Sequence, residues 1–213
     1  MAKQRKGKTS ELHRLMPLIE SQKAGLAKLP GYEGIVYRGA DDVPEEFLAQ
    51  HQGGAEVKYT AFTSTSRDER SAFGCRYRFL VYSQGGAKDI SLLSAHKEEA
   101  EQLFPLDTCF QVLEVEQQGP TSMYYLRECP RGDTFKAGTA EHAAIVRQLD
   151  DAARHLLAVE AALSDEELLT IKKQWAQFRD KVASGCSACA PDELSPYEAA
   201  KQEQARRERK RRV

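Results

Sequence analysis

The sequence predicts a single α+β domain in which one helix precedes a group of short strands and two long helices follow them. Its 213 residues suffice for one well-filled core with a helical appendage. β-branched and aromatic runs, separated by Gly and Pro turns, are confined to the middle of the chain. Apolar residues at helical spacing lie on both sides of that region, so helices and strands are segregated rather than alternating.

The first helix is expected over residues 9–28, where apolar residues recur at helical spacing behind a Thr or Ser cap. Pro30 and Gly31 end it. A short helix is expected at residues 43–51 and a helical turn at residues 68–73. Five strands are expected, with turns between them that include the Gly pairs at 53–54 and 85–86: residues 34–39, 59–66, 76–83, 109–116 and 122–129.

Two long helices are expected over residues 141–163 and from Ser164 to about residue 183, each with one apolar stripe. Ser164 and Glu167 form a capping box that opens the second helix. We expect the two helices to pack as an antiparallel hairpin. The expected organisation is a core at residues 9–135, a hairpin at 140–184 that packs on the core or binds a target, and a linker with a basic tail at 185–213.

Charge is distributed unevenly along the chain. The formal net charge is −1, but residues 1–8 and residues 195–213 each carry +4, which leaves −9 for the residues between them. The basic run at residues 206–212 could contact an acidic partner, and a solubilising terminus is the plainer interpretation. Because aromatic residues are not interleaved with this run, the sequence gives little ground for a nucleic-acid function.

Neither a secretory signal nor a membrane span is visible in the sequence, because the basic N-terminus has no long apolar stretch behind it. We therefore expect a cytoplasmic protein, or one delivered as an effector into the cytosol of a host cell without a Sec signal. Five cysteines with no regular spacing favour a reducing compartment. Cys186 and Cys189 form a lone CxxC without further ligands, so no metal site is expected.

Three short segments carry side chains suited to chemistry. Arg38 is followed directly by Gly39, so a backbone can come close to an anion that the guanidinium holds. Hydroxyl side chains fill residues 63–66 at the end of a strand, where they could bind a carboxylate or a ribose. Glutamates crowd residues 98–101 in a turn beside a strand, a usual place for acid/base groups. Each has an ordinary alternative: a structural salt bridge, a polar strand end and a solvated acidic turn.

Together, in this order and with these flanks, the three segments resemble the mono-ADP-ribosyltransferases of the Arg-Ser-Glu class. Members of that family carry an Arg on a first strand, a Ser-Thr-Ser strand and a Glu-x-Glu turn. The chain has VYRGA with Arg38, AFTSTS with Ser64, and EEAEQLFP with Glu99 and Glu101. The resemblance covers residues 28–116 and implies the mixed β-sheet core of that family, here with an N-terminal helix and a C-terminal helical hairpin.

The resemblance implies NAD as co-substrate and a role for each motif residue. Departure of nicotinamide leaves an oxocarbenium-like ribose, which needs negative charge nearby and a grip on its 2′-hydroxyl. Glu101 would supply both, with its carboxylate oriented by Ser64, and Arg38 would hold the phosphates and ribose of NAD. In this family a Glu at the position of Glu99 accompanies transfer to arginine, because a guanidinium is a poor nucleophile until a carboxylate shares its proton.

Three further residues are implied in NAD binding. Backbone groups of Gly39 would meet the nicotinamide amide, and the hydroxyl of Thr65 would bind a carboxylate or the ribose. Phe73 is a candidate ring to clamp the nicotinamide, and a core position explains it equally well.

The sequence therefore predicts an NAD-dependent protein ADP-ribosyltransferase that modifies a side chain of a target protein, arginine by default. A bacterial toxin or effector that acts on host proteins is the expected context. Three alternatives stay open: a Thr or Ser hydroxyl as acceptor, NAD glycohydrolysis by water, and a binding module without catalysis.

Overall fold

The computed structural model describes residues 17–94 and 97–185. Among the described residues, those up to residue 30 and those from residue 31 onward form separate compact units. In the first unit, residues 17–26 are helical and carry an exposed ion pair between Lys23 and Glu20 (3.1 Å). This agrees with the helix expected at 9–28, whose first residues lie outside the described ones. All further elements belong to the second unit.

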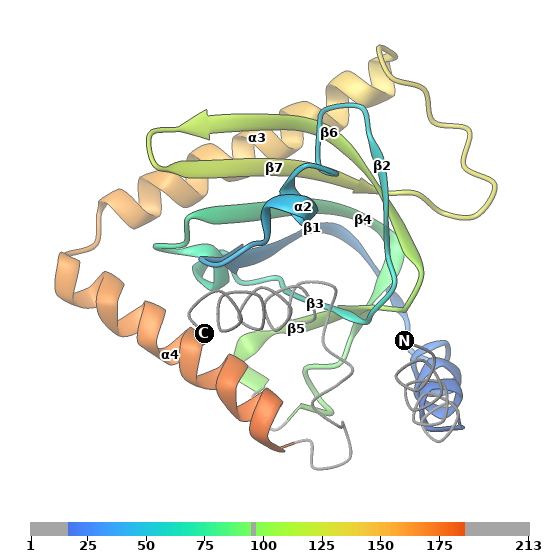
Figure 1. The fold of residues 1–213 in the computed structure, drawn as a ribbon, viewed down its shortest axis with the longest axis horizontal. Coiled ribbons are helices and arrows are strands. Elements are labelled where there is room, and N and C mark those ends of the chain that lie inside the picture. Colours follow the sequence, from blue (N-terminus) through green and yellow to red (C-terminus); the bar gives the residue numbers. More distant parts are fainter. Residues whose placement is uncertain (1–16, 95–96, 186–213) are drawn as a thin grey trace, which may run out of the picture. The chain divides into compact units, whose positions relative to one another are not determined.

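In the described residues, seven strands form one mixed sheet in the order β1-β3-β5-β4-β7-β6-β2, and β1 also pairs with β4 (Figure 1). The pairing of β4 with β7 is parallel and the other pairings are antiparallel. The mixed sheet with flanking helices confirms the α+β prediction. The strands are β1 (Gly31–Ala40), β2 (Glu56–Tyr59), β3 (Thr63–Ser66), β4 (Tyr77–Asp89), β5 (Glu101–Phe104), β6 (Thr108–Gln118) and β7 (Thr121–Glu128).

β3 and β5 form a short two-stranded unit beside the longer strands. Ser66 of β3 pairs with Tyr37 of β1, and Lys88 at the end of β4 pairs with Leu103 of β5. On its other side, β1 pairs with β4 along its whole length. The short pair therefore branches from the main sheet and brings the residues of β3 and β5 next to the end of β1.

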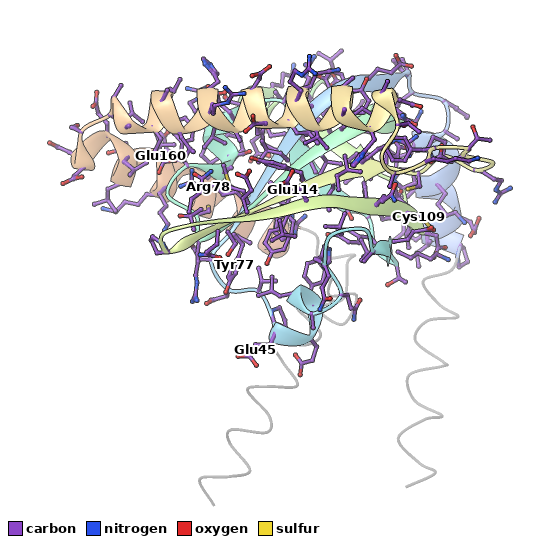
Figure 2. All side chains as sticks on the ribbon, turned by 90° about the horizontal axis from the view of Figure 1, so that it is seen from above. Glu45, Tyr77, Arg78, Cys109, Glu114 and Glu160 are labelled. Carbon is purple, nitrogen blue, oxygen red and sulfur yellow. The ribbon has the colours of Figure 1, made fainter. Side chains whose placement is uncertain are left out.

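Apolar side chains alternate along β4, and each face of the sheet has its own core. Phe79 and Val81 belong to an aromatic-rich cluster against which α2 (Glu45–Leu48) packs, whereas Leu80 belongs to the cluster beneath α3 (Ala140–Ala161). Figures 1 and 2 show α3 along one face of the sheet and α2 over the other. The site described below lies where β1, β3 and β5 meet.

α4 (Asp165–Gly185) departs from the expected hairpin. The capping box itself is present: the Glu167 backbone N–H donates to Ser164 Oγ (3.3 Å), and the Ser164 backbone N–H donates to the Glu167 carboxylate (2.9 Å). Beyond this turn, α4 bends away from α3 instead of packing along it, and it lies against η1 (Glu69–Ala72) (Figure 1). The apolar stripe of α3 is buried against the sheet, and Leu168 and Ile171 in the first turns of α4 reach the same cluster.

The division of the short strands corrects the sequence prediction. The strand expected at residues 59–66 is two strands, because Tyr59 pairs with β6 whereas Thr63 pairs with β5, and the chain changes partner between them. β5 was not expected as a strand, since its four residues contain no β-branched side chain and follow directly on the acidic turn.

A bulge replaces the turn expected at Gly85 and Gly86. Both glycines lie inside β4, and Gly85 has a φ of 97°, which favours glycine. The carboxylate of Glu128 on β7 accepts the backbone N–H groups of Gln84 (2.7 Å) and Gly86 (3.0 Å). A Cβ on Gly86 would overlap that carboxylate, so the strand continues through the glycine pair around a buried acid.

Within residues 17–94 and 97–185, no helix is long and apolar enough to cross a membrane. The same part of the chain holds no group of three or more His, Cys, Asp or Glu side chains that could hold a metal ion. Cys75, Cys109 and Cys129 form no disulfide there. The CxxC at Cys186 and Cys189 and the basic tail lie outside the described residues.

Candidate active site

Arg38 lies near the end of β1 and reaches across to β3. Val36, two residues earlier, is fully buried in the aromatic-rich cluster, so Arg38 lies on the same face of the sheet. Its Nη1 donates to the backbone carbonyl of Ser64 (2.9 Å). Burial raises the pKa of the neighbouring Tyr59 phenol, and the charge of Arg38 opposes only part of that shift. Tyr59 therefore stays neutral beside the guanidinium at physiological pH.

Gly39 allows a close approach of two backbone segments directly behind Arg38. A Cβ at Gly39 would lie 2.5 Å from Cys75 Sγ and 2.8 Å from both Ala72 Cα and Ser71 O. Because two of these atoms are backbone atoms of a packed segment, any side chain here would displace it. The residues that follow β3 are thus seated on β1 at the position next to Arg38.

The pairing of β3 with β5 places Ser64 beside Glu101. In the antiparallel register, Ser64 lies opposite Leu103 and Ser66 lies opposite Glu101, so Ser64 and Glu101 are diagonal neighbours on one face. Ser64 Oγ donates to Glu101 Oε1 (2.6 Å), a short hydrogen bond to a carboxylate. The structure therefore brings the three predicted residues Arg38, Ser64 and Glu101 together where β1, β3 and β5 meet.

The glutamate turn consists of η2 (Lys97–Glu99), Ala100 and the start of β5. Ala100 has a φ of 46°, a left-handed conformation that costs a residue with a side chain about 1–2 kcal/mol. Two backbone hydrogen bonds hold this conformation. The Ala100 N–H donates to the Lys97 carbonyl, and the Ala100 carbonyl accepts from the Arg67 N–H, both at 3.2 Å. Ser66 Oγ donates to the Glu99 carbonyl (2.5 Å). β3 and the residue after it thus fix the turn.

The two glutamates of the motif differ in exposure. Glu99 is 7% exposed, whereas Glu101 is half-buried. A carboxylate buried to this degree can act only on a group that enters the site, and this limits which acceptors Glu99 could serve.

Sequence reasoning missed an ion pair that supports the glutamate turn. Arg67, whose N–H holds Ala100, places its Nη2 3.1 Å from Asp89 Oδ2. Asp89 Oδ1 accepts from the N–H (3.0 Å) and Oγ (2.6 Å) of Ser91. These hydrogen bonds lower the pKa of Asp89, and the charge of Arg67 adds to the effect. The Asp-x-Ser spacing is typical of an Asx turn and could have indicated this support.

The arrangement of these residues agrees with a comparison across known families. Residues 9–134 match the family described as NAD:arginine ADP-ribosyltransferase. The chain belongs to this family.

Bacterial ADP-ribosyltransferases are among its relatives. The NAD(+)–protein-arginine ADP-ribosyltransferase Tre1 of Pseudomonas putida is 35% identical over 126 residues, which are 59% of this chain and 25% of that protein. The Tre1 of Serratia proteamaculans is 41% identical over 107 residues, which are 50% of this chain and 23% of that protein. The chain therefore spans about a quarter of the length of these relatives.

A solved ADP-ribosyltransferase shares the fold. The crystal structure of ADP-ribosyltransferase Vis, from Vibrio splendidus, in complex with the M6 inhibitor is 26% identical, with a TM-score of 0.50. The likeness covers 58% of this chain and 61% of that chain. It confirms the ADP-ribosyltransferase-like sheet core that the sequence motifs predicted.

Two residues expected to bind NAD in an ADP-ribosyltransferase lie in the interior instead. Thr65 is 5% exposed, and its Oγ1 donates to the carbonyl of Gln102 (2.7 Å), on the side of β3 opposite to Ser64. Phe73 is 2% exposed and belongs to the cluster beneath α3, with Leu80. Thr65 thus ties β3 to β5, and Phe73 occupies the core position that was its alternative, while their roles toward NAD stay predictions.

Proposed function

We propose that this chain cleaves NAD at the bond between nicotinamide and ribose and transfers the ADP-ribose to an arginine side chain of a protein. The observation that carries the proposal is the convergence of Arg38, Ser64 and Glu101, which come from three strands. Membership of the NAD:arginine ADP-ribosyltransferase family and two relatives named protein-arginine ADP-ribosyltransferases support it.

Arg38 supplies the positive charge that the diphosphate of NAD requires. Its hydrogen bond to the Ser64 carbonyl fixes the plane of the guanidinium, and a planar guanidinium binds phosphate oxygens in pairs. Gly39 follows Arg38 on the same strand, and its backbone groups would bind the nicotinamide amide.

Glu101 stabilises the charge that develops when nicotinamide leaves. The electron pair of the glycosidic C–N bond departs with nicotinamide, and the ribose C1′ becomes positively charged. A carboxylate held in place by the Ser64 hydroxyl needs no reorganisation at that moment, which makes its stabilisation effective. The same carboxylate accepts a hydrogen bond from the ribose 2′-hydroxyl and so orients the sugar.

Glu99 prepares the acceptor. An arginine guanidinium has a pKa above about 12 and is protonated until a base takes its proton. Glu99 lies two residues from Glu101 in a turn that backbone bonds hold rigid. As a guanidinium nitrogen bonds to C1′, its proton passes to the Glu99 carboxylate. The arginine side chain is long enough to reach a buried base, which a short side chain is not.

One observation favours NAD glycohydrolysis as a second candidate function. Because Glu99 is only 7% exposed, water reaches it more easily than the side chain of a folded protein does. In that reaction water takes the ribose, nicotinamide is released and no protein is marked.

The proposed partner is a target protein, and the proposed context is a bacterial toxin or effector domain delivered into the cytosol of a host cell. The similarity to bacterial Tre1 proteins supports this context.

The test is incubation of the purified chain with NAD and a cell lysate. Chromatography measures nicotinamide release, and mass spectrometry identifies ADP-ribosylated peptides. The wild-type chain should release nicotinamide and label arginine. Glu101→Gln removes the charge with little change of shape and should lower both by about 100-fold or more. Glu99→Gln should keep release within about threefold and lose the arginine label. Glu114→Gln, at an exposed position of β6, is the control.

Each outcome of this test decides between the candidate functions of the site. Release that persists in Glu101→Gln contradicts the role of that carboxylate. Release without a labelled peptide supports glycohydrolysis, and a label on Ser or Thr replaces arginine as the acceptor. Absence of both in the wild-type chain contradicts an active enzyme.

A further inference from the structure

The two C-terminal helices hold both backbone groups of Gly74. The Gly74 N–H donates to Glu160 Oε1 of α3 (3.3 Å), and the Gly74 carbonyl accepts from Lys172 Nζ of α4 (2.7 Å). Gly74 has a φ of 66°, so the chain turns sharply there between η1 and β4. A turn in which each of the two polar backbone groups is bonded to a different distant helix is held from both sides.

Glu160 is itself anchored deep in the fold. Its carboxylate meets the guanidinium of Arg78 on β4 at two points, with Arg78 Nη1 2.7 Å from Oε2 and Nη2 3.0 Å from Oε1. The side chains of both residues are largely buried, and Figure 2 shows them beside one another near the end of α3. Arg78 Nε also donates to the Cys75 carbonyl (3.0 Å). The contact of Glu160 with Gly74 is therefore fixed by the buried core.

The Lys172 contact to Gly74 is accessible to solvent, unlike the contact of Glu160. The Lys172 ammonium also lies 3.2 Å from Asp41 Oδ2, and Asp41 Oδ1 in turn accepts from the Arg76 N–H (3.1 Å). The Lys172 side chain is 37% exposed. Lys172 contacts Asp41, which follows β1, and Gly74, which follows η1, and its side chain is accessible to solvent. It can therefore be replaced without opening the core.

The segment held in this way is the one that packs against Gly39. Ser71, Ala72 and Cys75 come so close to Gly39 that a Cβ there would lie within 2.8 Å of an atom of each. Gly39 also lies opposite Arg78 in the register of β1 with β4. The segment and the strand position that Lys172 and Glu160 bind therefore lie beside Gly39, the residue that follows Arg38.

We infer that Lys172 and Glu160 are positioning residues of the NAD site: the C-terminal helices clamp Gly74, which seats residues 71–75 against Gly39 and keeps Arg38 in place for the NAD diphosphate. The inference rests on the proposed function. η1 is a single short helical turn, and the side chains of Glu160 and Lys172 add the two hydrogen bonds that fix Gly74 directly behind it. Without them, NAD binding would have to fix the position of this turn. An ordering cost of this kind lowers the affinity for the ligand.

The test is the replacement of Lys172 in the full chain. Lys172→Met keeps the stem and removes the charged donor, Lys172→Arg keeps donors for Gly74 and Asp41, and Lys173→Met is the control at the exposed neighbouring position. KM and kcat are measured by nicotinamide release. The Kd for NAD is measured by calorimetry in a Glu101→Gln background, in which turnover of NAD should be slower by about 100-fold or more.

Lys172→Met should raise KM and Kd for NAD by about 3- to 10-fold, with kcat within about twofold of wild type. Lys172→Arg should restore both constants to within about twofold, and Lys173→Met should match wild type. A Lys172→Met variant that loses unfolding free energy but keeps KM and Kd overturns the inference, as does an equal change in Lys173→Met. A wild-type chain that binds NAD without releasing nicotinamide contradicts the proposed function alone, and Kd then decides the inference.

Discussion

Ser64 joins two sequence motifs that lie 37 residues apart, and what it contributes is orientation rather than packing. The residue is exposed, so removal of its hydroxyl leaves no cavity. The hydroxyl donates to Glu101 Oε1 at 2.6 Å, and a hydrogen bond to a charged group is about twice as strong as one between neutral groups. This bond holds the carboxylate of Glu101 beside Ser64, whose backbone carbonyl accepts from Arg38 Nη1 (2.9 Å).

Ser64→Ala is expected to lower kcat for nicotinamide release by about 10- to 100-fold, the effect of one hydrogen bond to a charged group. The free energy of unfolding should change by less than about 0.5 kcal/mol, as is usual at exposed positions. Thr65→Val is the matched comparison, because it removes a buried hydroxyl that ties β3 to β5, and it should cost about 1–2 kcal/mol of stability. Chromatography of nicotinamide and urea unfolding measure the two effects. Equal losses of stability in both variants would contradict the orienting role.

The sequence predicted which residues meet better than it predicted which are exposed. The grouping of Arg38, Ser64 and Glu101 could be predicted because each belongs to a motif with specific flanking residues. Their roles stay predictions. The burial of Thr65 follows from the alternation of side chains along a strand, once Ser64 is assigned to the exposed side. The burial of Phe73 could not be predicted in this way, because it depends on α3, which comes much later in the chain.

Elements with a strong local signal were predicted well, and elements defined by their partners were not. The helix expected at 141–163 is found at Ala140–Ala161, and its buried residues follow the predicted stripe. β5 and the break between β2 and β3 depend on which strand each segment pairs with. The bend between α3 and α4 depends on how much of the α3 surface the sheet has already covered. Local periodicity contains none of this information.

His51 connects α2 to β2 through both nitrogens of its ring. A carbonyl only accepts, so Nδ1 donates to the Phe47 carbonyl, and Nε2 of the neutral ring accepts from the Tyr59 hydroxyl, both at 2.7 Å. The residue is 2% exposed and lies among the rings of Phe47 and Phe79. Burial lowers the pKa of His51, and the hydrogen bond to Phe47 opposes part of that shift. The link between the two elements therefore requires the neutral ring.

Acid should weaken the fold through His51. Because the folded-state pKa lies below the unfolded value of about 6.5, the unfolded chain binds more protons between those two values. The free energy of unfolding should fall as the pH drops from about 6.5 toward the folded pKa, with a slope of up to about 1.4 kcal/mol per pH unit. Urea unfolding of the wild-type chain and His51→Gln across this range measures it. An identical slope in the variant, which cannot titrate there, would show that other groups cause the loss.

At the scale of the whole molecule, α3 is a structural part of the catalytic fold even though the family match ends at residue 134. Ile145, Leu149 and Leu156 are at most 4% exposed and cover the face of the sheet that carries Leu80 and Tyr125. Each such side chain stabilises the fold by about 1.5–3 kcal/mol when buried. The three together are comparable with the whole net stability of a domain, about 5–15 kcal/mol.

A chain that ends at Gly138 should therefore fail to fold, although it contains Arg38 and Glu101. Without α3, the fully buried Leu80 and Tyr125 would face water, and the truncated chain should bind the dye ANS and lack near-UV circular dichroism. Leu149→Ala in the full chain should cost about 2–5 kcal/mol, whereas Leu169→Ala, at a position 51% exposed, should cost less than about 0.5 kcal/mol. A cooperatively folded chain of residues 1–138 that binds NAD would instead support the core boundary predicted at residue 135, and α3 and α4 would then serve the site only through Glu160 and Lys172.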